Sequence, residues 1–445
     1  MQLSKALRIG DGEIVAFVGG GGKSTAMFRL AQEIADAGGK VITTTTTRIF
    51  AAQIPLAPIH FSSYEVDRAR LEAALADKGH VLVTAPINRA EGKAAGVSLE
   101  VVRALGAVPG VSAILIEADG SRMRPFKAPA EHEPVIPPET TLVVPVVGAD
   151  IFGEPLNEVR VHRSELVRAL TGAAVDEPVT PTLVAQVLTH PAGGLKGVPP
   201  AARVIPLVNK VDDLRALTAA RETARALLRH ARVEAVLLGA TRQAEAVREV
   251  HGRVAAVVLA AGRSTRMGRP KQTLPWGETT IIGQVVRQLR RAQIDEIVVV
   301  TGGARAEVEA ALNGSGARLV FNPDFEQGEM ASSLQAGLRE LPQNCQAALA
   351  VLADQPQIQV EVITAVVQRW RETLAPIVAP SYQMRRGHPL LFDRAEWAAI
   401  RLLPPGANPR DYLRQAAGLE YVAVNTDSIL RDLDTPADYE RERQS

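Results

Sequence analysis

A run of four glycines followed by a lysine comes directly after the apolar run at residues 14–18 and has the composition of a phosphate-binding loop. Glycine amides and the start of a helix can face phosphate oxygens, a lysine can reach between phosphates, and a serine hydroxyl can bind Mg²⁺. The loop is shorter than the eight-position form, because Phe17 stands where that form requires glycine. The predicted nucleotide-binding residues are Gly19, Gly22, Lys23, Ser24 and Thr25.

A second loop of small and basic residues follows the apolar run 254–259. Small residues let main-chain N–H groups approach a phosphate closely, and the arginines and the lysine supply the positive charge that a triphosphate needs. A surface turn that happens to be basic is the alternative, but the strand before the loop favours phosphate binding. The predicted members of this site are Ala260, Ala261, Gly262, Arg263, Arg266, Gly268 and Lys271.

Four carboxylates come at the ends of apolar runs, where expected strands stop. Phosphoryl transfer uses hard oxygen ligands to hold Mg²⁺, which neutralises charge on the phosphates. We therefore predict metal ligation by Glu117 and Asp119, together with Ser24, beside the first loop, and by Asp354 and Asp434 beside the second. The alternatives are a solvated turn for the first pair and a helix cap or turn for the second.

The segment Asn209, Lys210, Val211 and Asp212 follows the apolar run 204–208 and has the N-K-x-D pattern, in which the aspartate accepts from guanine. This pattern favours GTP over ATP at the first loop. The threonines at 43–47 end another expected strand and offer hydroxyls near the phosphates, although threonine is also an ordinary strand residue.

The elements that must position these residues alternate along the chain. From residue 13 to 238, short β-branched runs alternate with helical stretches, which predicts parallel strands with crossover helices. The stretch 24–36 has one apolar stripe and predicts a helix directly after the first loop. An arginine- and alanine-rich stretch at 241–250 predicts another helix, and the pattern restarts at Gly252. We predict two α/β domains, residues 1–250 and 251–445.

Composition narrows the function classes. A chain of 445 residues fits two domains, and 46% hydrophobic but only 4% aromatic residues suit aliphatic, parallel-sheet cores. A net charge of +1 argues against nucleic acid or an anionic membrane surface as a partner. Without a long apolar run or a secretory signal, we expect a cytoplasmic protein. Cys345 is the only cysteine, which excludes an internal disulfide and a cysteine-based zinc cluster.

The C-terminal half resembles the molybdenum cofactor cytidylyltransferases, which belong to the MobA-like nucleotidyltransferases. The likeness covers nearly all of residues 254–442. The motifs that carry it are 259–268 with Lys271, 301–303, 322–323, 328–334, 354–356, 386–389 and 432–436.

This resemblance implies a doubly wound, Rossmann-like sheet that binds CTP and Mg²⁺, with molybdopterin-bound molybdenum as the acceptor substrate. It implies that Arg266 and Lys271 stabilise the phosphates and that Asp354 and Asp434 hold the metal. His388 either contacts the acceptor phosphate or is a structural turn residue. The Ala260 and Ala261 pair looks more like the cytidylyl than the guanylyl enzymes, and GTP or ATP stay open.

The N-terminal half resembles the YqeC-type accessory proteins linked to selenium-dependent molybdenum hydroxylases. This resemblance implies a P-loop-like parallel sheet with helices. The segments that carry this likeness are 19–25, 43–48, 117–120, 127–134 and 209–212. We interpret His132 and its two glutamate neighbours as an exposed polar loop. Because this half lacks cysteine, it cannot carry selenium on a thiol of its own.

These observations favour a cytidylyltransferase fused to a nucleotide-binding accessory domain. One alternative keeps nucleotidyl transfer but changes the acceptor to a sugar phosphate or a polyol phosphate. Another makes the N-terminal half a GTP-gated module that delivers cofactor to a molybdenum hydroxylase apoenzyme.

Overall fold

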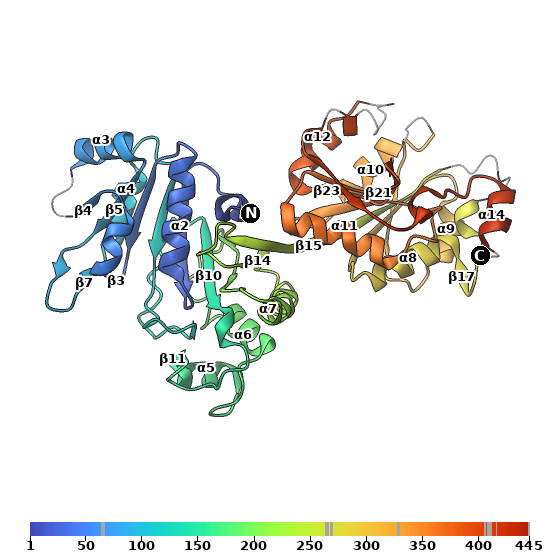
Figure 1. Ribbon diagram of the computed structural model, residues 1–445. Helices are drawn as coiled ribbons and strands as arrows, with labels where there is room; N and C mark the ends of the chain where they lie inside the picture. The colour runs from blue at the N-terminus through green and yellow to red at the C-terminus, as the bar shows by residue number, and fades with distance from the viewer. Residues whose placement is uncertain are drawn as a thin grey trace. The chain divides into compact units, whose positions relative to one another are not determined.

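The computed structural model describes residues 1–63, 67–262, 267, 270–326, 330–404, 406, 412–414 and 416–443. The chain divides into two compact units, Met1–His251 and Gly252–Ser445 (Figure 1). Each unit contains a largely parallel sheet with helices on both faces, so the predicted two-domain α/β fold is confirmed.

Eight strands of the first unit's sheet run parallel, in the order β4-β5-β2-β8-β1-β10-β13-β14. Short, β-branched and fully buried runs form its central strands, as expected for a sheet covered on both faces. A two-residue strand, β12 (Arg203–Val204), also pairs with β10. The main strands are β1 (Glu13–Gly19), β2 (Val41–Thr45), β4 (His60–Ser62), β5 (His80–Thr84), β8 (Ala113–Glu117), β10 (Leu142–Gly148), β13 (Leu207–Asn209) and β14 (Ala235–Gly239).

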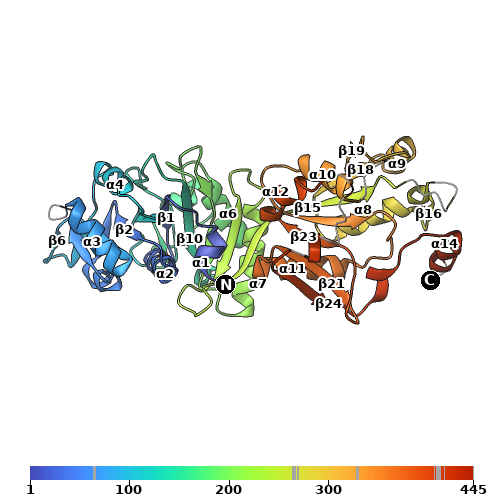
Figure 2. The ribbon, with the colours of Figure 1, turned by 90° about the horizontal axis from the view of Figure 1, so that it is seen from above.

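Helices cover both faces of this sheet. Ala16 and Val18 of β1 pack in one buried cluster with Leu71 of α3 (Arg68–Lys78) and Leu105 of α4 (Leu99–Gly106). The helix α2 (Lys23–Asp36), predicted over 24–36, packs against β1, β2 and β8, and Figure 2 shows it on the side of the sheet opposite α4. The remaining helices are α1 (Leu3–Leu7), α5 (Ser164–Thr171), α6 (Pro181–Thr189) and α7 (Leu214–Leu227).

Two small sheets add to the first unit. An antiparallel sheet of β3 (Arg48–Phe50), β7 (Lys93–Ala95) and β6 (Ile87–Asn88) follows directly on β2. A parallel pair, β9 (Phe126–Lys127) and β11 (Val161–His162), follows β8 and precedes α5. Both small sheets therefore branch from loops that follow the carboxyl ends of central strands.

The second unit has the strand order β19-β18-β15-β20-β23-β21-β24, in which β23 runs antiparallel to both neighbours. Helices α10 and α12 pack with one face in a common cluster, while α8 and α11 lie on the other (Figure 1). The bounds are β15 (Val247–Ala260), β18 (Glu296–Thr301), β19 (Arg318–Phe321), β20 (Cys345–Leu352), β21 (Ile377–Tyr382), β23 (Leu390–Asp393), β24 (Leu419–Ala423), α8 (Ile281–Arg291), α9 (Arg305–Ala311), α10 (Met330–Arg339), α11 (Val360–Thr373), α12 (Trp397–Arg401) and α14 (Pro436–Arg443).

The helix predicted over 241–250 is wrong. Residues 241–245 form turns, and β15 begins at Val247, whose N–H donates to the carbonyl of Met1 at 3.0 Å. Strand pairing and the burial of Val247 and Val250 outweigh the helix propensity of the alanines and arginines. The chain consequently passes from the first unit to the second within one strand. A smaller difference is the expected strand 204–208, which Pro206 divides into β12 and β13.

Within the described segments, none of the helices combines the length and apolar character that crossing a membrane requires. Cys345 is buried at the start of β20.

Candidate functional site

The glycine loop between β1 and α2 has a backbone that side chains would not fit. Gly19, Gly21 and Gly22 have φ values of +95°, +78° and +113°, in the region that favours glycine. A Cβ on Gly21 would lie 2.1 Å from the main-chain nitrogen of Gly148, and one on Gly22 would lie 2.6 Å from Asn209 Nδ2. The loop is therefore packed tightly against the ends of neighbouring strands, with α2 beginning directly behind it.

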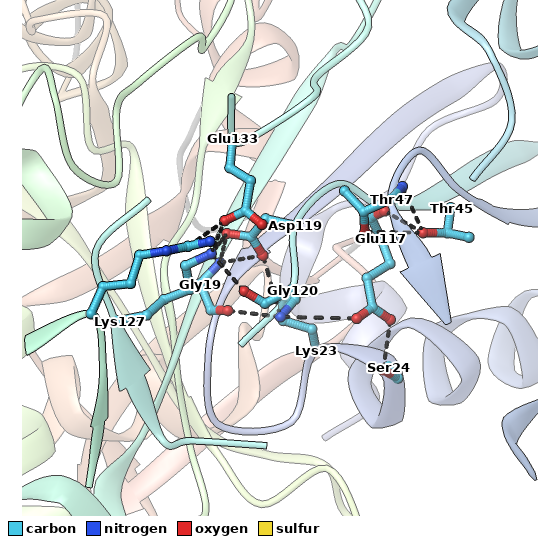
Figure 3. Close-up of polar contacts among 11 residues, drawn as sticks. Gly19, Lys23, Ser24, Thr45, Thr47, Glu117, Asp119, Gly120, Lys127 and Glu133 are labelled. Carbon is cyan, nitrogen blue, oxygen red and sulfur yellow. Dashed lines mark hydrogen bonds and ion pairs between the residues drawn. The ribbon is translucent and has the colours of Figure 1, made fainter. Parts of the chain in front are cut away.

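Lys23 begins α2 and its side chain is buried, with 3% of its surface exposed. Its Nζ donates to the carbonyl of Gly19 at 2.7 Å and lies 3.3 Å from Asp119 Oδ1 (Figure 3). The ammonium is thus held between the carbonyl of Gly19, the first residue of the glycine loop, and Asp119, beside the loop where the sequence predicted a phosphate.

Glu117, the last residue of β8, meets the next residue of the helix. Ser24 Oγ donates to Glu117 Oε2 at 2.6 Å, and Lys23 Nζ lies 3.9 Å from Glu117 Oε1. Burial raises the pKa of Glu117, against the opposing charge of Lys23. Glu117 and Ser24, which pair at this strand end, are two of the three ligands predicted for Mg²⁺ beside this loop.

The threonines of β2 have partners other than a phosphate. Thr45 Oγ1 donates to the carbonyl of Glu117 at 2.9 Å, whereas Thr44 and Thr46 donate to main-chain carbonyls farther along the chain. Thr43 Oγ1 lies 2.9 Å from His80 Nε2. Of the predicted hydroxyl row, Thr45 and Thr47 also contact each other, with their hydroxyl oxygens 3.4 Å apart.

Asp119 is surrounded by donors from the protein. Its two carboxylate oxygens accept from the amide of Gly19 at 3.1 and 3.0 Å. Lys23 approaches Oδ1, and Lys127 of β9 lies 3.0 Å from Oδ2. Glu117, by contrast, accepts from the hydroxyl of Ser24. Asp119 and Glu117, the two carboxylates predicted as metal ligands, therefore have different surroundings.

Lys127 continues into a chain of buried charges that the sequence did not predict (Figure 3). Glu133 Oε2 lies 2.7 Å from Lys127 Nζ and 2.6 Å from Arg163 Nη1. Burial opposes the charge of Glu133, but hydrogen bonds from Arg163 and Lys127 lower its pKa to about 2. His132 is exposed as predicted, whereas the prediction of an exposed Glu133 is wrong. The signal available was that Lys127 and Glu133 both lie in one of the segments that carry the resemblance, 127–134.

The N-K-x-D segment reaches the same loop. Asn209 Nδ2 donates to the carbonyl of Gly21 at 2.9 Å, and Asn209 Oδ1 accepts from the amide of Thr241 at 3.0 Å. Lys210 pairs with Asp150 at 2.7 Å, and exposed Asp212 accepts from Gln243 at 2.9 Å. The structure thus brings Asn209 to the glycine loop and leaves Asp212 on the surface.

The second candidate site lies where strands of the second unit end. Gly302, after β18, approaches so closely that a Cβ would lie 2.5 Å from the carbonyl of Ala261. Ala353 N donates to the carbonyl of Leu259, and Leu433 N donates to the carbonyl of Asp354, both at 3.4 Å. These contacts bring the loop after β15 together with both predicted aspartate segments, at the carboxyl edge where α/β sheets bind ligands.

Lys271 joins the two predicted metal ligands. Its Nζ lies 2.5 Å from Asp354 Oδ2 and 3.0 Å from Asp434 Oδ1. Burial opposes the charge of the lysine, but the two aspartates together raise its pKa. Asp354 lies in a turn, and Thr435 rather than Asp434 caps α14, because Thr435 Oγ1 accepts from the amide of Asp438 at 3.2 Å. Neither aspartate therefore acts as the helix cap considered from sequence.

A cavity of about 330 Å³ opens beside this lysine. Asp432 lines it and was not singled out from sequence, although it stands two residues before Asp434. Partial burial and the charge of Asp354 raise the pKa of Asp432, and its Oδ1 accepts from Gln355 Nε2 at 2.7 Å. The lining residues are Leu259, Ala261, Gly262, Lys271, Gln272, Phe325, Met330, Ser333, Leu352, Ala353, Asp354 and Asp432.

Other predicted residues have different positions. Arg263, Arg266 and Gly268 lie outside the described residues. His388 is half-buried, its main-chain N–H donates to the carbonyl of Ile429 at 3.3 Å, and it is not among the described residues that line the cavity.

In the described parts of the chain, no three His, Cys, Asp or Glu side chains form a metal cage. The two candidate positions offer fewer protein ligands, namely Asp354 with Asp434, and Glu117 with Ser24. Mg²⁺ commonly keeps several waters and takes one or two carboxylates plus substrate phosphates, so these donor sets fit it.

Comparisons with known proteins agree with the division into two units. The family described as YqeC protein matches residues 15–165, and the MobA-like NTP transferase domain matches residues 256–420. The Escherichia coli K12 "Uncharacterized protein YqeC" is 32% identical over 241 residues, which are 53% of this chain and 90% of that protein. The E. coli K12 "Molybdenum cofactor cytidylyltransferase" is 27% identical over 181 residues, 40% of this chain and 90% of that protein.

Solved structures of Rv0371c from Mycobacterium tuberculosis H37Rv, one of them a complex with manganese, are 28% identical. They cover 44% and 43% of this chain and 99% of those chains, with TM-scores of 0.40 and 0.38.

The second unit thus contains a MobA-like NTP transferase domain, which classes this unit with the nucleotidyltransferases. The chain belongs to the YqeC family through its first unit, and a MobA-like NTP transferase domain follows in the second unit.

Proposed function

We propose that the second unit transfers a cytidylyl group from CTP to the terminal phosphate of molybdopterin-bound molybdenum and releases pyrophosphate. The observation that carries this proposal is Lys271 held between Asp354 and Asp434 beside a cavity. The similarity to the E. coli molybdenum cofactor cytidylyltransferase supports the choice of CTP and of the acceptor.

In the proposed reaction, an oxygen of the acceptor phosphate attacks the α-phosphorus of CTP, and the bond to the bridging oxygen of pyrophosphate breaks. Lys271 exchanges its aspartate partners for phosphate oxygens and stabilises the charge of the leaving group. Asp354 and Asp434 would hold Mg²⁺, which supplies further neutralisation of phosphate charge. Ala261 and Gly262, which line the cavity, permit close approach of the substrate to the main chain. Arg263, Arg266 and Gly268 complete the proposed phosphate site.

The test measures pyrophosphate release by the full chain with Mg²⁺, molybdenum-loaded molybdopterin and CTP, GTP or ATP in turn. Asp354→Asn removes a ligand charge and should lower the rate about a hundredfold or more. Asp295→Asn, which alters an exposed aspartate of the same unit, is the matched control and should leave the rate unchanged. Equal rates for both variants would exclude Asp354 from the mechanism. Release that requires a sugar phosphate or polyol phosphate would change the acceptor.

We also propose that the first unit binds a nucleoside triphosphate at Gly19–Ser24. The buried Lys23 at the loop and the pairing of Ser24 with Glu117 support this site, and Glu117 with Ser24 would hold its Mg²⁺. The contact of Asn209 with Gly21 supports GTP as the nucleotide, with Asp212 as the acceptor for the base. The bound nucleotide would gate the handing of cofactor to a molybdenum hydroxylase apoenzyme.

Calorimetry on the full chain, with the second site saturated by CTP, should detect magnesium-dependent binding of GTP in preference to ATP. Gating predicts slow GTP hydrolysis that accelerates when the apoenzyme is added. Fast hydrolysis with a small acceptor, yielding a phosphorylated product, would contradict gating and identify a kinase or a ligase.

A further inference from the structure

The ammonium group of Lys127 has three oxygen neighbours, two of them in hydrogen bonds and one in an ion pair. It lies 3.0 Å from Asp119 Oδ2, 2.6 Å from the carbonyl of Gly120 and 2.7 Å from Glu133 Oε2. Its side chain is 1% exposed. A buried ammonium that already pairs with two carboxylates and a carbonyl is poorly placed to contact a substrate directly. Any effect of Lys127 on the glycine loop must therefore pass through the groups that it contacts.

Asp119 is the group that connects Lys127 to the loop. One carboxylate stands between two lysines, Lys23 on Oδ1 and Lys127 on Oδ2, and both of its oxygens also accept from the amide of Gly19 (Figure 3). Lys23 in turn donates to the carbonyl of Gly19. The first residue of the loop is consequently held at both its N–H and its carbonyl by charges that Asp119 links.

Lys127 itself is anchored from two further segments. Glu133 accepts from Lys127 and from Arg163, and Arg163 directly precedes α5. Strand β9 holds the backbone of Lys127 by pairing with β11, in the register Lys127 to His162. The Lys127 ammonium is therefore also held by segments other than the glycine loop, although the backbone just before β9 accepts from the amide of Gly21 through the carbonyl of Arg124 at 3.0 Å.

We propose that Lys127 is a positioning residue for the phosphate loop: held by Glu133 and Arg163, it fixes Asp119 and shares that negative charge, which leaves Lys23 able to exchange Asp119 for nucleotide phosphates. Without Lys127, the buried carboxylate of Asp119 has Lys23 as its one remaining lysine partner and holds it more strongly against the protein. A positive charge beside an incoming polyanion is also lost. This inference rests on the proposed nucleotide site of the first unit.

The test compares Lys127→Met with Lys196→Met in the full chain. Lys196 is a matched control, because its ammonium holds the same 130–133 loop by donating to the carbonyls of Ala130 and Glu131. Two properties are measured: hydrogen exchange of the amides in 19–24 without nucleotide, and the affinity for magnesium GTP. Lys127→Met should accelerate exchange and weaken GTP binding about tenfold or more, and Lys196→Met should change both less than about twofold.

A double-mutant cycle separates positioning from general support of the fold. If Lys127 acts through Asp119, adding Lys127→Met to Asp119→Asn should weaken binding by less than about twofold further. Lys127→Arg should restore most of the affinity. Should Lys127→Met fail to fold, Glu133→Gln removes the charge that anchors Lys127 and should accelerate exchange to a smaller extent.

The outcomes are distinct. Equal exchange in the Lys127 and Lys196 variants, or losses that multiply in the double variant, would overturn the proposal. Absence of GTP binding by the unaltered chain would overturn the nucleotide site, while faster exchange confined to the Lys127 and Glu133 variants would still support the positioning role.

Discussion

Lys23 and Lys271 occupy similar settings in the two units but are supported in different ways. Each follows a glycine-containing loop after the first strand of its unit and lies between two carboxylates. Lys23 is 3% exposed and its partner Asp119 is bound in turn by Lys127. Lys271 is 14% exposed and its partner Asp434 is 49% exposed. A lysine between two carboxylates is thus buried in the first unit, whereas in the second unit it lies at the edge of a cavity.

The glycines of the two loops differ in the same sense. A Cβ on Gly21 would meet three main-chain atoms of residues 147–148 within 2.7 Å, whereas a Cβ on Gly262 would meet no described atom within 4 Å. The first loop owes its shape to surrounding strands. A side chain at Gly262 would not meet any neighbour in the part of the chain that the structure describes, which suits a site where substrate and product must exchange.

Replacing Gly21 with alanine should strongly destabilise the first unit, whereas replacing Gly262 with alanine should leave the stability of the second unit almost unchanged. Gly21→Ala combines a positive φ with main-chain overlap and should cost more than about 4 kcal/mol of unfolding free energy. Gly262→Ala should change it by less than about 0.5 kcal/mol. Denaturant unfolding of both variants measures the difference, and similar losses would contradict the contrast between the loops.

Methionine at the two lysines should separate stability from activity. Lys23→Met leaves Glu117 and Asp119 buried without this partner and should cost about 3 kcal/mol of unfolding free energy. Lys271→Met should cost less than about 1 kcal/mol, because Asp434 is half-exposed, but should lower pyrophosphate release about 10²-fold or more. Unfolding curves and rates on the same preparations provide the check. Unchanged release by the Lys271 variant would remove that lysine from the proposed mechanism.

Lowering the pH should destabilise the first unit through His80, the first residue of β5. Burial lowers the pKa of His80 to about 4, and its Nδ1 has no hydrogen-bond partner in the described part of the chain. Because the folded-state pKa lies below the value of 6.5 for the unfolded chain, the stabilisation is complete above pH 6.5 and is lost as the pH falls toward 4. We expect the unfolding free energy to fall by about 2 kcal/mol from pH 7 to pH 5.

His80→Gln supplies the comparison for that pH dependence, since glutamine does not titrate. Its unfolding free energy should change by less in this interval. A parallel pH dependence in the variant would assign the loss to other groups.

Local patterns in the sequence predicted the features that are local in the structure. The strand 14–18, the glycine loop and the helix 24–36 are consecutive, so composition and periodicity were sufficient for them. The ion pairs that link Lys127, Glu133 and Arg163 form only when separate segments of the chain come together in the fold, and no spacing along the sequence predicts them. Charged residues in a polar stretch also predict exposure, which is wrong for Glu133 because two cations accompany it into the core.

The same limit explains the second unit. Asp354 and Asp434 were predicted as ligands because each follows an apolar run. Their shared contact with Lys271 was not predicted, since 83 residues separate Lys271 from Asp354. Asp432 was overlooked because it lies inside the run 429–433, whose three apolar residues, Ile429, Leu430 and Leu433, led only to the aspartate that follows the run. The helix expected at 241–250 had the right propensities, but strand pairing decided the outcome.

The passage between the units inside β15 has a practical consequence. His251 and Gly252, on either side of the division, are both buried within that strand. Proteases cut where several residues of chain are accessible, as in exposed loop tips. Limited digestion of the intact protein should therefore leave the peptide bond between these residues uncut, and separate halves will have to come from designed gene fragments whose ends preserve or replace the shared strand.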